Sequence, residues 1–203
     1  MQHYKDLIRY KKFTREDLIK YLPSGSVAEV GVALGEFSDK ILKYNKPKKL
    51  YLIDAWKNFD LGYPDGNMKS NKIQEERYNY VLARFKKRKQ ISIVREKSLD
   101  ASNYIEDNSL DWVYIDADHS YEGCLKDLKC YDKKVKITGY ICGHDWLADN
   151  FSREGFGVNK AVLDFVREKD YILTIITKEK KYKSYVISKS VESSENLLKK
   201  INE

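Results

Sequence analysis

Two short stretches of the chain carry titratable side chains close together. Asp116, Asp118 and His119 follow one apolar run, and His144 and Asp145 follow the next. Carboxylate oxygens and imidazole nitrogens can jointly hold a divalent cation, for which Asp116, His144 and Asp145 are the candidate ligands. His119 or His144 could instead take a proton from a hydroxyl substrate. A third interpretation is that these side chains cap helices and hydrogen-bond one another.

A glycine-bearing turn stands earlier in the chain. Gly31 and Gly35 follow an apolar run that carries Glu29. Glycine lets the backbone turn sharply and approach a ligand, and the N–H groups of the following helix then point at that ligand. The dinucleotide-binding pattern G-x-G-x-x-G is not matched, because Ala33 and Leu34 occupy its middle positions. A pyrophosphate ligand is therefore disfavoured.

Asp54 ends the next apolar run, 19 residues after Gly35. A carboxylate at this position can accept hydrogen bonds from both hydroxyls of a ribose. Glu29 provides a second acid, suited to a cationic amino-acid group. Two acids flanking a glycine turn suit a zwitterionic nucleoside better than a pyrophosphate. The competing interpretation of Asp54 is an ordinary aspartate in a turn at the end of a strand.

Apolar runs alternate with helical segments over most of the chain, which predicts a mostly parallel sheet with crossover helices. The expected strands are 26–31, 49–54, 91–94, 110–116, 139–143, 172–177 and 184–188. Only a lysine-rich turn separates the last two, so they can pair as an antiparallel hairpin. The predicted fold class is α/β, with a doubly wound, seven-stranded sheet that is mostly parallel and ends in an antiparallel hairpin.

Segments outside this alternation are short. Thr14 with an acid at Asp17 predicts a helix start, within an N-terminal helical segment expected over residues 1–24. The main domain is expected over 25–189, followed by a C-terminal tail over 190–203 with a frayed helix. Two polar loops, 57–71 and 147–157, are long enough to act as lids that exclude water.

Composition places the chain among ordinary globular domains. Of its 203 residues, 42% are hydrophobic and 34% charged, and no apolar run approaches the length of a membrane span. The N-terminal residues lack the apolar core of a signal peptide, so we expect a cytoplasmic protein. Three cysteines without a CxxC pair disfavour disulfides and a structural zinc site. The net charge of +7 includes lysine-rich clusters at 84–89 and 178–183, typical of solvated element ends or of a nucleic-acid footprint.

Five motifs in register carry a resemblance to a known family. They are residues 29–38, 52–56, 115–121, 143–146 and 157–162. With these motifs the chain resembles the class I S-adenosylmethionine-dependent methyltransferases, and more narrowly methyltransferase family 24. That family is related to sugar and macrolide O-methyltransferases and to catechol-type enzymes. The resemblance spans residues of about 25 to 188 and implies a Rossmann-like fold.

The resemblance implies roles for individual residues. Asp54 would bind the ribose of S-adenosylmethionine, with Ala55 and Trp56 beside the adenine and Ser98 at its edge. The full predicted cofactor set is Glu29, Gly31, Gly35, Ser38, Asp54, Ala55, Trp56, Ser98 and Asp116.

A second set of residues is implied for catalysis and metal binding. Asp116 matches the first metal-binding aspartate of divalent-dependent members, and His144 with Asp145 matches their second acidic pair. Those enzymes commonly carry Asp-Asp or Asp-Asn there, so the histidine is a departure. Asp116, His144 and Asp145 are the predicted ligands of Mg²⁺ or another divalent cation. His119, His144 and Asp145 are the predicted catalytic residues.

The expected function is O-methylation of a small hydroxylated acceptor, such as a sugar or polyol. In that case the partner is a small molecule, nucleic acid and membrane are not expected, and a homodimer is allowed. The basic balance keeps an RNA methyltransferase open as an alternative. A nicotinamide dehydrogenase and a nucleoside-binding protein without catalysis are further alternatives on the same fold.

Overall fold

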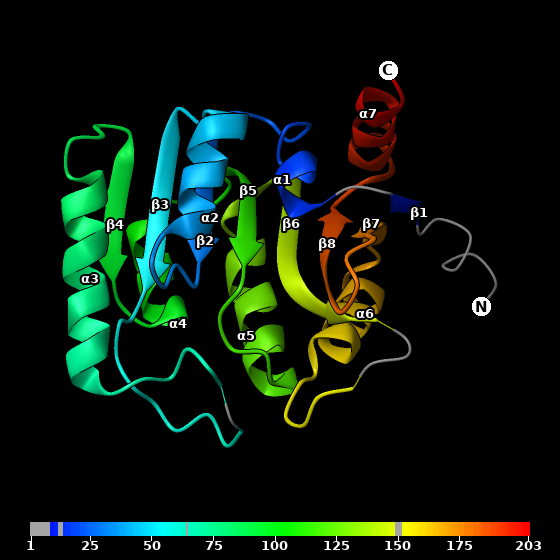
Figure 1. Ribbon diagram of the computed structural model, residues 1–203. Helices are drawn as coiled ribbons and strands as arrows, with labels where there is room; N and C mark the ends of the chain where they lie inside the picture. The colour runs from blue at the N-terminus through cyan, green and yellow to red at the C-terminus, as the bar shows by residue number, and fades with distance from the viewer. Residues whose placement is uncertain (1–8, 12–13, 64, 149–151) are drawn as a thin grey trace.

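A mixed β-sheet forms the centre of the molecule in the computed structural model, which describes residues 9–11, 14–63, 65–148 and 152–203 (Figure 1). Its strands are β1 (Arg9–Lys11), β2 (Ser26–Val30), β3 (Lys49–Asp54), β4 (Ile91–Arg95), β5 (Leu110–Ile115), β6 (Val135–Leu147), β7 (Ile172–Thr177) and β8 (Tyr182–Ser188). Their order across the sheet is β1-β7-β8-β6-β5-β2-β3-β4. Strand β8 is antiparallel to β6 and β7, and the other pairs are parallel. The predicted mostly parallel sheet with a C-terminal hairpin is confirmed, and β1 adds an eighth strand at one edge.

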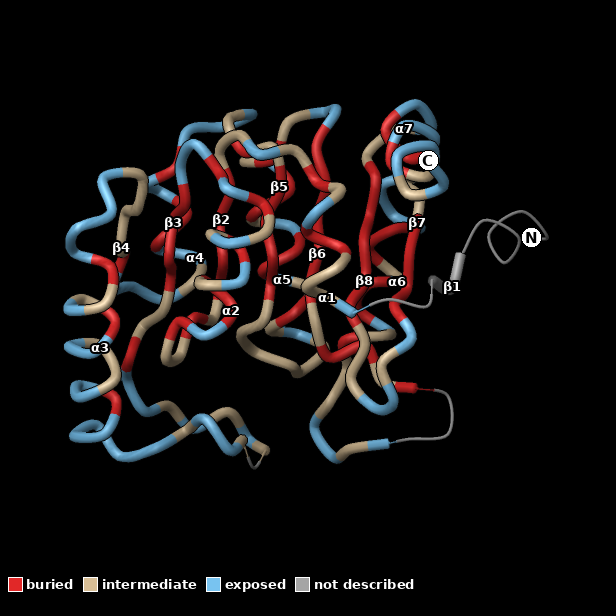
Figure 2. The backbone as a smooth tube through the Cα atoms, turned by 45° about the horizontal axis from the view of Figure 1, so that its top comes forward, coloured by how far each residue is buried: buried red, intermediate tan, exposed pale blue. Residues whose placement is uncertain are grey.

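Helices cover both faces of the sheet, as a doubly wound fold requires. They are α1 (Arg15–Leu18), α2 (Glu36–Lys40), α3 (Asn71–Phe85), α4 (Ser98–Ala101), α5 (Tyr121–Asp132), α6 (Val158–Lys169) and α7 (Val191–Asn202). Buried side chains of α4, α5 and α6 join one apolar cluster, and those of α1, α2, α3 and α7 join the other. Figure 2 shows the buried strands between these layers. None of the helices in the described part of the chain is long and apolar enough to span a membrane.

The central strands are apolar on both faces because both faces are covered. In β5, Val113 and Ile115 belong to one apolar cluster, while Trp112 and Tyr114 belong to the other. Successive side chains of a strand point to opposite faces, so a strand between two helical layers reads as a continuous apolar run. This pattern made β5 recognisable in the sequence.

The two chain ends differ from expectation. The cap on α1 is present as predicted, since the Thr14 hydroxyl accepts from the Asp17 N–H. However, Arg9–Lys11 is a strand paired with β7, so the segment over 1–24 is not wholly helical; residues 1–8 and 12–13 lie outside the described residues. The expectation of a frayed C-terminal helix is wrong, because Leu197 of α7 is buried in the same cluster as Leu18 of α1.

A buried carboxyl joins β2 to α2. Glu29 is 2% exposed, and its Oε2 accepts a hydrogen bond from the Ser38 hydroxyl. Burial raises the pKa of Glu29 to about 8, although the hydrogen bond from Ser38 opposes this. The carboxyl is therefore mostly protonated at neutral pH. A neutral, hydrogen-bonded carboxyl is compatible with such burial, whereas an isolated carboxylate is not.

This burial predicts a pH-dependent stability. The unfolded glutamate has its ordinary pKa near 4.5 and the folded one a pKa of about 8, so folding retains a proton. The free energy of unfolding should therefore fall as pH rises through this window, by at most about 1.4 kcal/mol per pH unit for this group. Glu29→Gln should flatten that slope, as measured by urea unfolding across the window. Glu76→Gln, at an exposed position of α3, is the matched control. Parallel slopes for wild type and Glu29→Gln would contradict the assignment.

Candidate active site at the carboxyl ends of the parallel strands

The turn that follows β2 lies directly against the tip of β5. Gly31 has a φ of +93°, and a Cβ at this position would come within 1.9 Å of the Asp116 carbonyl oxygen. The Asp116 N–H donates to the Val30 carbonyl oxygen at 2.7 Å. Gly35, with φ +73°, meets Phe85 in a similar way, at 2.6 Å from Cε2. Side chains at these two positions would force the turn away from its neighbours. The glycines were predicted to let the backbone approach a ligand. They also let the turn pack against Asp116 and Phe85 of the same chain.

Asp54, at the end of β3, holds this turn in place. Its Oδ2 accepts hydrogen bonds from the N–H groups of Val32 and Ala33, at 3.0 and 2.9 Å. Its Oδ1 accepts from the Trp56 N–H at 2.7 Å. A carboxylate offers about four acceptor positions, so Oδ1 retains room for about one further hydrogen bond. Asp54 is therefore a structural clamp on the turn that can still accept from one ligand hydroxyl.

Trp56 supports the same turn from the core. It is 1% exposed, has a φ of +41°, and its indole N–H donates to the Ala33 carbonyl oxygen at 2.8 Å. Its ring packs 5.1 Å from that of Tyr78. The burial of Trp56 therefore disfavours its predicted contact with adenine. Ala55, the other residue predicted beside the adenine, is only partly buried.

Ser98 lies just beyond β4, at the same edge of the sheet. Its hydroxyl donates to Asp127 of α5. Burial raises the pKa of Asp127 to about 7, with the Ser98 hydrogen bond opposing the rise. The predicted position of Ser98 at a strand tip is thus observed, and its side chain is already tied to a buried acid.

An irregularity in β6 brings two neighbouring side chains to one place. The register between β6 and β8 shifts between Gly143 and Trp146, and Asp145 has a φ of +57°. In a regular strand, His144 and Asp145 would point to opposite faces of the sheet. The bulge removes this alternation, as bulges near functional sites commonly do. His144 Nδ1 consequently lies 3.2 Å from Asp145 Oδ2.

Asp116, at the tip of the adjacent β5, completes a cluster with these two residues. One ligand atom from each of Asp116, His144 and Asp145 lies within 4.8 Å of the others. His144 Nδ1 is 3.9 Å from Asp116 Oδ1. All three side chains are mostly buried, with Asp145 only 7% exposed as a residue. The structure thus brings together the three residues predicted as metal ligands.

His119 lies among carboxylates from three segments. Its Nε2 is 3.0 Å from Asp145 Oδ2 and 3.6 Å from Asp116 Oδ1, and its Nδ1 is 3.4 Å from Asp65 Oδ2. Burial alone would lower the pKa of His119, but the three carboxylates outweigh it and raise the pKa well above the usual range. Burial likewise tends to raise the pKa of Asp145, but His119 and His144 bring it well below its ordinary value.

This electrostatic setting favours an imidazolium at position 119. A group that holds its proton so strongly is a poor general base. The carboxylates around His119 therefore disfavour its predicted role as proton acceptor. Neither ring nitrogen of His119 makes an aligned hydrogen bond within the described residues. The ring therefore neutralises its carboxylate neighbours mainly through charge.

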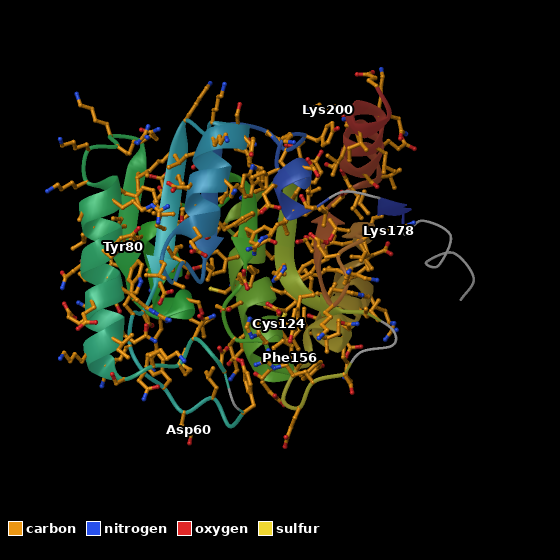
Figure 3. All side chains as sticks on the ribbon, viewed as in Figure 1. Asp60, Tyr80, Cys124, Phe156, Lys178 and Lys200 are labelled. Atoms are coloured by element: carbon orange, nitrogen blue, oxygen red, sulfur yellow. The ribbon has the colours of Figure 1, made fainter. Side chains whose placement is uncertain are left out.

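Two loops contact His119 through their described residues: the first loop (residues 55–63 and 65–70) and the second loop (residues 148 and 152–157). The Tyr63 hydroxyl accepts from the His119 N–H at 2.9 Å and donates to Asp118 at 3.2 Å. The ring of Phe156 stacks on that of His119 with centroids 4.8 Å apart. Figure 3 shows Phe156 at the same end of the molecule as Asp60 of the first loop. The two loops predicted as lids thus both contact His119, whose side chain is 12% exposed.

Two charged contributors had no distinguishing signal in the sequence. Asp65 stands in an irregular polar loop, and Arg15 stands on a short helix 101 positions away from Asp116. Arg15 Nη1 lies 3.3 Å from Asp116 Oδ2. Only the tertiary fold brings these residues to the strand tips.

Comparison with known proteins identifies the family. A methyltransferase domain model of family 24 matches residues 28–146, which is more than half of the chain and includes every predicted site residue. A search of curated protein sequences finds no match.

Solved structures share the fold at low sequence identity. A SAM-dependent methyltransferase from Aquifex aeolicus is 16% identical, with 84% of this chain and 85% of that chain covered and a TM-score of 0.59. The tRNA methyltransferase TrmK from B. subtilis is 15% identical, with coverage of 88% and 67% and a TM-score of 0.53. Fibrillarin from Aeropyrum pernix, solved with natively bound S-adenosyl-L-methionine, is 11% identical, with coverage of 83% and 68% and a TM-score of 0.58.

The fold, the glycine turn with its acidic neighbours and the family match agree. The chain belongs to methyltransferase family 24 and is a class I S-adenosylmethionine-dependent methyltransferase.

Proposed function

We propose that this enzyme methylates a hydroxyl oxygen of a small acceptor such as a sugar or polyol, assisted by a divalent cation. The observation that carries the proposal is the convergence of Asp116, His144 and Asp145 within 4.8 Å, beside the glycine turn. Methyl transfer is an in-line displacement, so the main task of the protein is to align the acceptor oxygen with the reacting carbon. A cluster of oxygen and nitrogen ligands next to the cofactor turn is suited to that alignment.

The residues around the turn suit S-adenosylmethionine. The cofactor supplies a methyl group activated by a sulfonium. Asp54 retains one acceptor position for a ribose hydroxyl, and Ala55 and Ser98 lie at neighbouring strand ends where the adenine would be placed. Gly31 and Gly35 let the turn pack closely against Asp116 and Phe85. The hydrogen bond from Ser38 to Glu29 connects α2 to the strand before the turn.

The three clustered side chains also suit a divalent cation. Two carboxylates and an imidazole form a donor set for hard to borderline metals. A bound cation would lower the pKa of a coordinated hydroxyl and fix its orientation. Without a cation, Asp145 can accept from Nδ1–H of His144, which leaves Nε2 of that ring to accept the acceptor's proton. Activity in the presence of a chelator distinguishes cation binding by the cluster from proton acceptance by His144.

The loops over His119 favour a small acceptor. Tyr63 and Phe156 contact His119 from opposite loops, and Gly155 lies against Tyr63, where a Cβ would come within 2.2 Å. Loops that meet in this way exclude water and large substrates from the strand tips. A capped site is easier to reconcile with a sugar-sized molecule than with a folded RNA.

One observation favours the second candidate, an RNA methyltransferase. The lysine-rich turn between β7 and β8 lies at the same edge of the sheet as the site, since the Ala148 N–H donates to the Lys181 carbonyl oxygen at 3.0 Å. Tight, strongly salt-dependent binding of tRNA, together with methyl transfer to it, would favour this candidate over the small acceptor.

Loss of the clamp carboxylate should weaken cofactor binding strongly. Asp54→Ala removes a ribose acceptor and three hydrogen bonds that hold the turn, so we expect S-adenosylhomocysteine affinity to fall at least about tenfold to a hundredfold. Isothermal titration calorimetry measures this directly. Asp60→Ala, in the exposed part of the first loop, is the control. An unchanged dissociation constant for Asp54→Ala would rule out the ribose assignment.

Removal of divalent cations should lower activity. With an acceptor in hand, excess chelator is expected to reduce turnover, and added Mg²⁺ or Mn²⁺ should restore it. Asp145→Asn should weaken the restoring effect of the metal more than it weakens S-adenosylhomocysteine binding. Full turnover in excess chelator would refute cation assistance and leave His144 as the proton acceptor.

A further inference from the structure

Arg15 introduces a second cation, besides His119, into a site rich in carboxylates. Its Nη1 lies 3.3 Å from Asp116 Oδ2, and its guanidinium carbon lies 4.5 Å from the centroid of the Phe37 ring. Phe37 belongs to α2, the helix that follows the glycine turn. Arg15 therefore lies between the start of α2 and the tip of β5, beside the turn that we assign to the cofactor.

Several contacts fix the backbone of Arg15. Thr14 and Asp17 form a reciprocal capping box at the start of α1. The N–H of Arg15 donates to Glu179 Oε1, in the turn between β7 and β8, at 2.8 Å. The aromatic ring of Phe37 stabilises the guanidinium as a cation–π partner. An arginine held in this way loses little further conformational freedom when it binds an anion.

The contact with Asp116 uses only part of the hydrogen-bonding capacity of the Arg15 guanidinium. The guanidinium has five N–H donors in a planar fork that matches a carboxylate, and it stays charged at all relevant pH values. Burial tends to lower the pKa of Arg15, but the neighbouring Tyr114 hydroxyl and Asp116 carboxylate outweigh burial and raise the pKa above its ordinary value. The side chain remains 29% exposed, so it is accessible to a ligand.

Four N–H groups of the glycine turn already have acceptors within the chain. The N–H of Gly31 donates to Ile53, and that of Gly35 donates to Val32. The N–H groups of Val32 and Ala33 both donate to Asp54. A carboxylate placed beside these four residues could not use their N–H groups, and Arg15 offers it a charged donor from another segment.

We propose that Arg15 binds the α-carboxylate of the methionine part of S-adenosylmethionine, while Asp116 lies beside the α-ammonium. The proposal rests on the cofactor site assigned above. Arg15 would pair with the carboxylate and Asp116 with the ammonium, and the contact between these two side chains holds them side by side. Together they would position the amino-acid end of the cofactor. The short helix α1 thereby closes one side of the cofactor site.

A pair of ligands that differ only in the carboxylate tests this. S-adenosylhomocysteine and its decarboxylated analogue, 5′-deoxy-5′-(3-aminopropylthio)adenosine, are titrated into wild type, Arg15→Ala, Arg15→Lys and Lys20→Ala by calorimetry. Lys20→Ala removes one positive charge from the same segment, where Lys20 pairs with Asp17. We expect wild type to lose about tenfold to a hundredfold in affinity when the ligand loses its carboxylate. Arg15→Ala should bind the two ligands equally, Arg15→Lys should discriminate partly, and Lys20→Ala should behave as wild type.

The possible outcomes separate the two proposals. If wild type binds both ligands equally well, or if Arg15→Ala retains the full preference for the carboxylate, the role of Arg15 is overturned and the cofactor site stands. If Arg15→Ala weakens both ligands by the same factor, Arg15 is a structural residue only. If wild type binds neither ligand, the cofactor site itself fails, and the proposal for Arg15 fails with it. The wild-type comparison needs no variant, so it decides even if Arg15→Ala does not fold.

Discussion

The contact between the tips of β2 and β5 is the constraint on which the site depends. The Asp116 N–H reaches the Val30 carbonyl oxygen, and Gly31 leaves just enough space for the Asp116 carbonyl beside it. Because these two strands are adjacent at the point where the strand order reverses direction, their tips open toward the loops. In parallel sheets of this kind, that switch point is where ligands bind. The Asp54 clamp then fixes the turn, so the residues proposed for the cofactor and the acidic cluster lie at one edge of the sheet.

Two cations partly offset the carboxylates at this edge. Asp65, Asp116 and Asp145 surround His119, and Arg15 pairs with Asp116 from the other side. Carboxylates gathered at a mostly buried site would repel one another without these cations. The same arrangement suits a zwitterionic cofactor, since a positively and a negatively charged side chain, Arg15 and Asp116, lie 3.3 Å apart. It also explains why His119, beside the cluster of Asp116, His144 and Asp145, holds its proton instead of accepting one.

Some of this was accessible from sequence. Asp54, Asp116 and His144 each follow an apolar run in an alternating α/β pattern, and the carboxyl ends of parallel strands meet at one edge, so their convergence could be predicted. The antiparallel hairpin followed from the short lysine-rich turn. Arg15 and Asp65 could not be assigned, because their contacts depend on how α1 and the first loop pack and not on local periodicity.

Other features depend on backbone detail that residue patterns do not encode. The bulge at His144 and Asp145 puts consecutive residues on one side of β6, contrary to the strand period. The family resemblance places Trp56 beside the adenine, but no residue pattern indicates that its side chain is buried or that its φ is positive. The pairing of β1 with β7 and the packing of α7 likewise arise from long-range contacts between the chain ends and the sheet.

A crystal structure of the enzyme with S-adenosylhomocysteine and Mn²⁺ tests the central claim most directly. The account predicts the ribose against Asp54 and an anomalous peak bonded to Asp116, His144 and Asp145. A nucleoside bound away from the turn over residues 31–35, with no metal density among those three side chains, would contradict it.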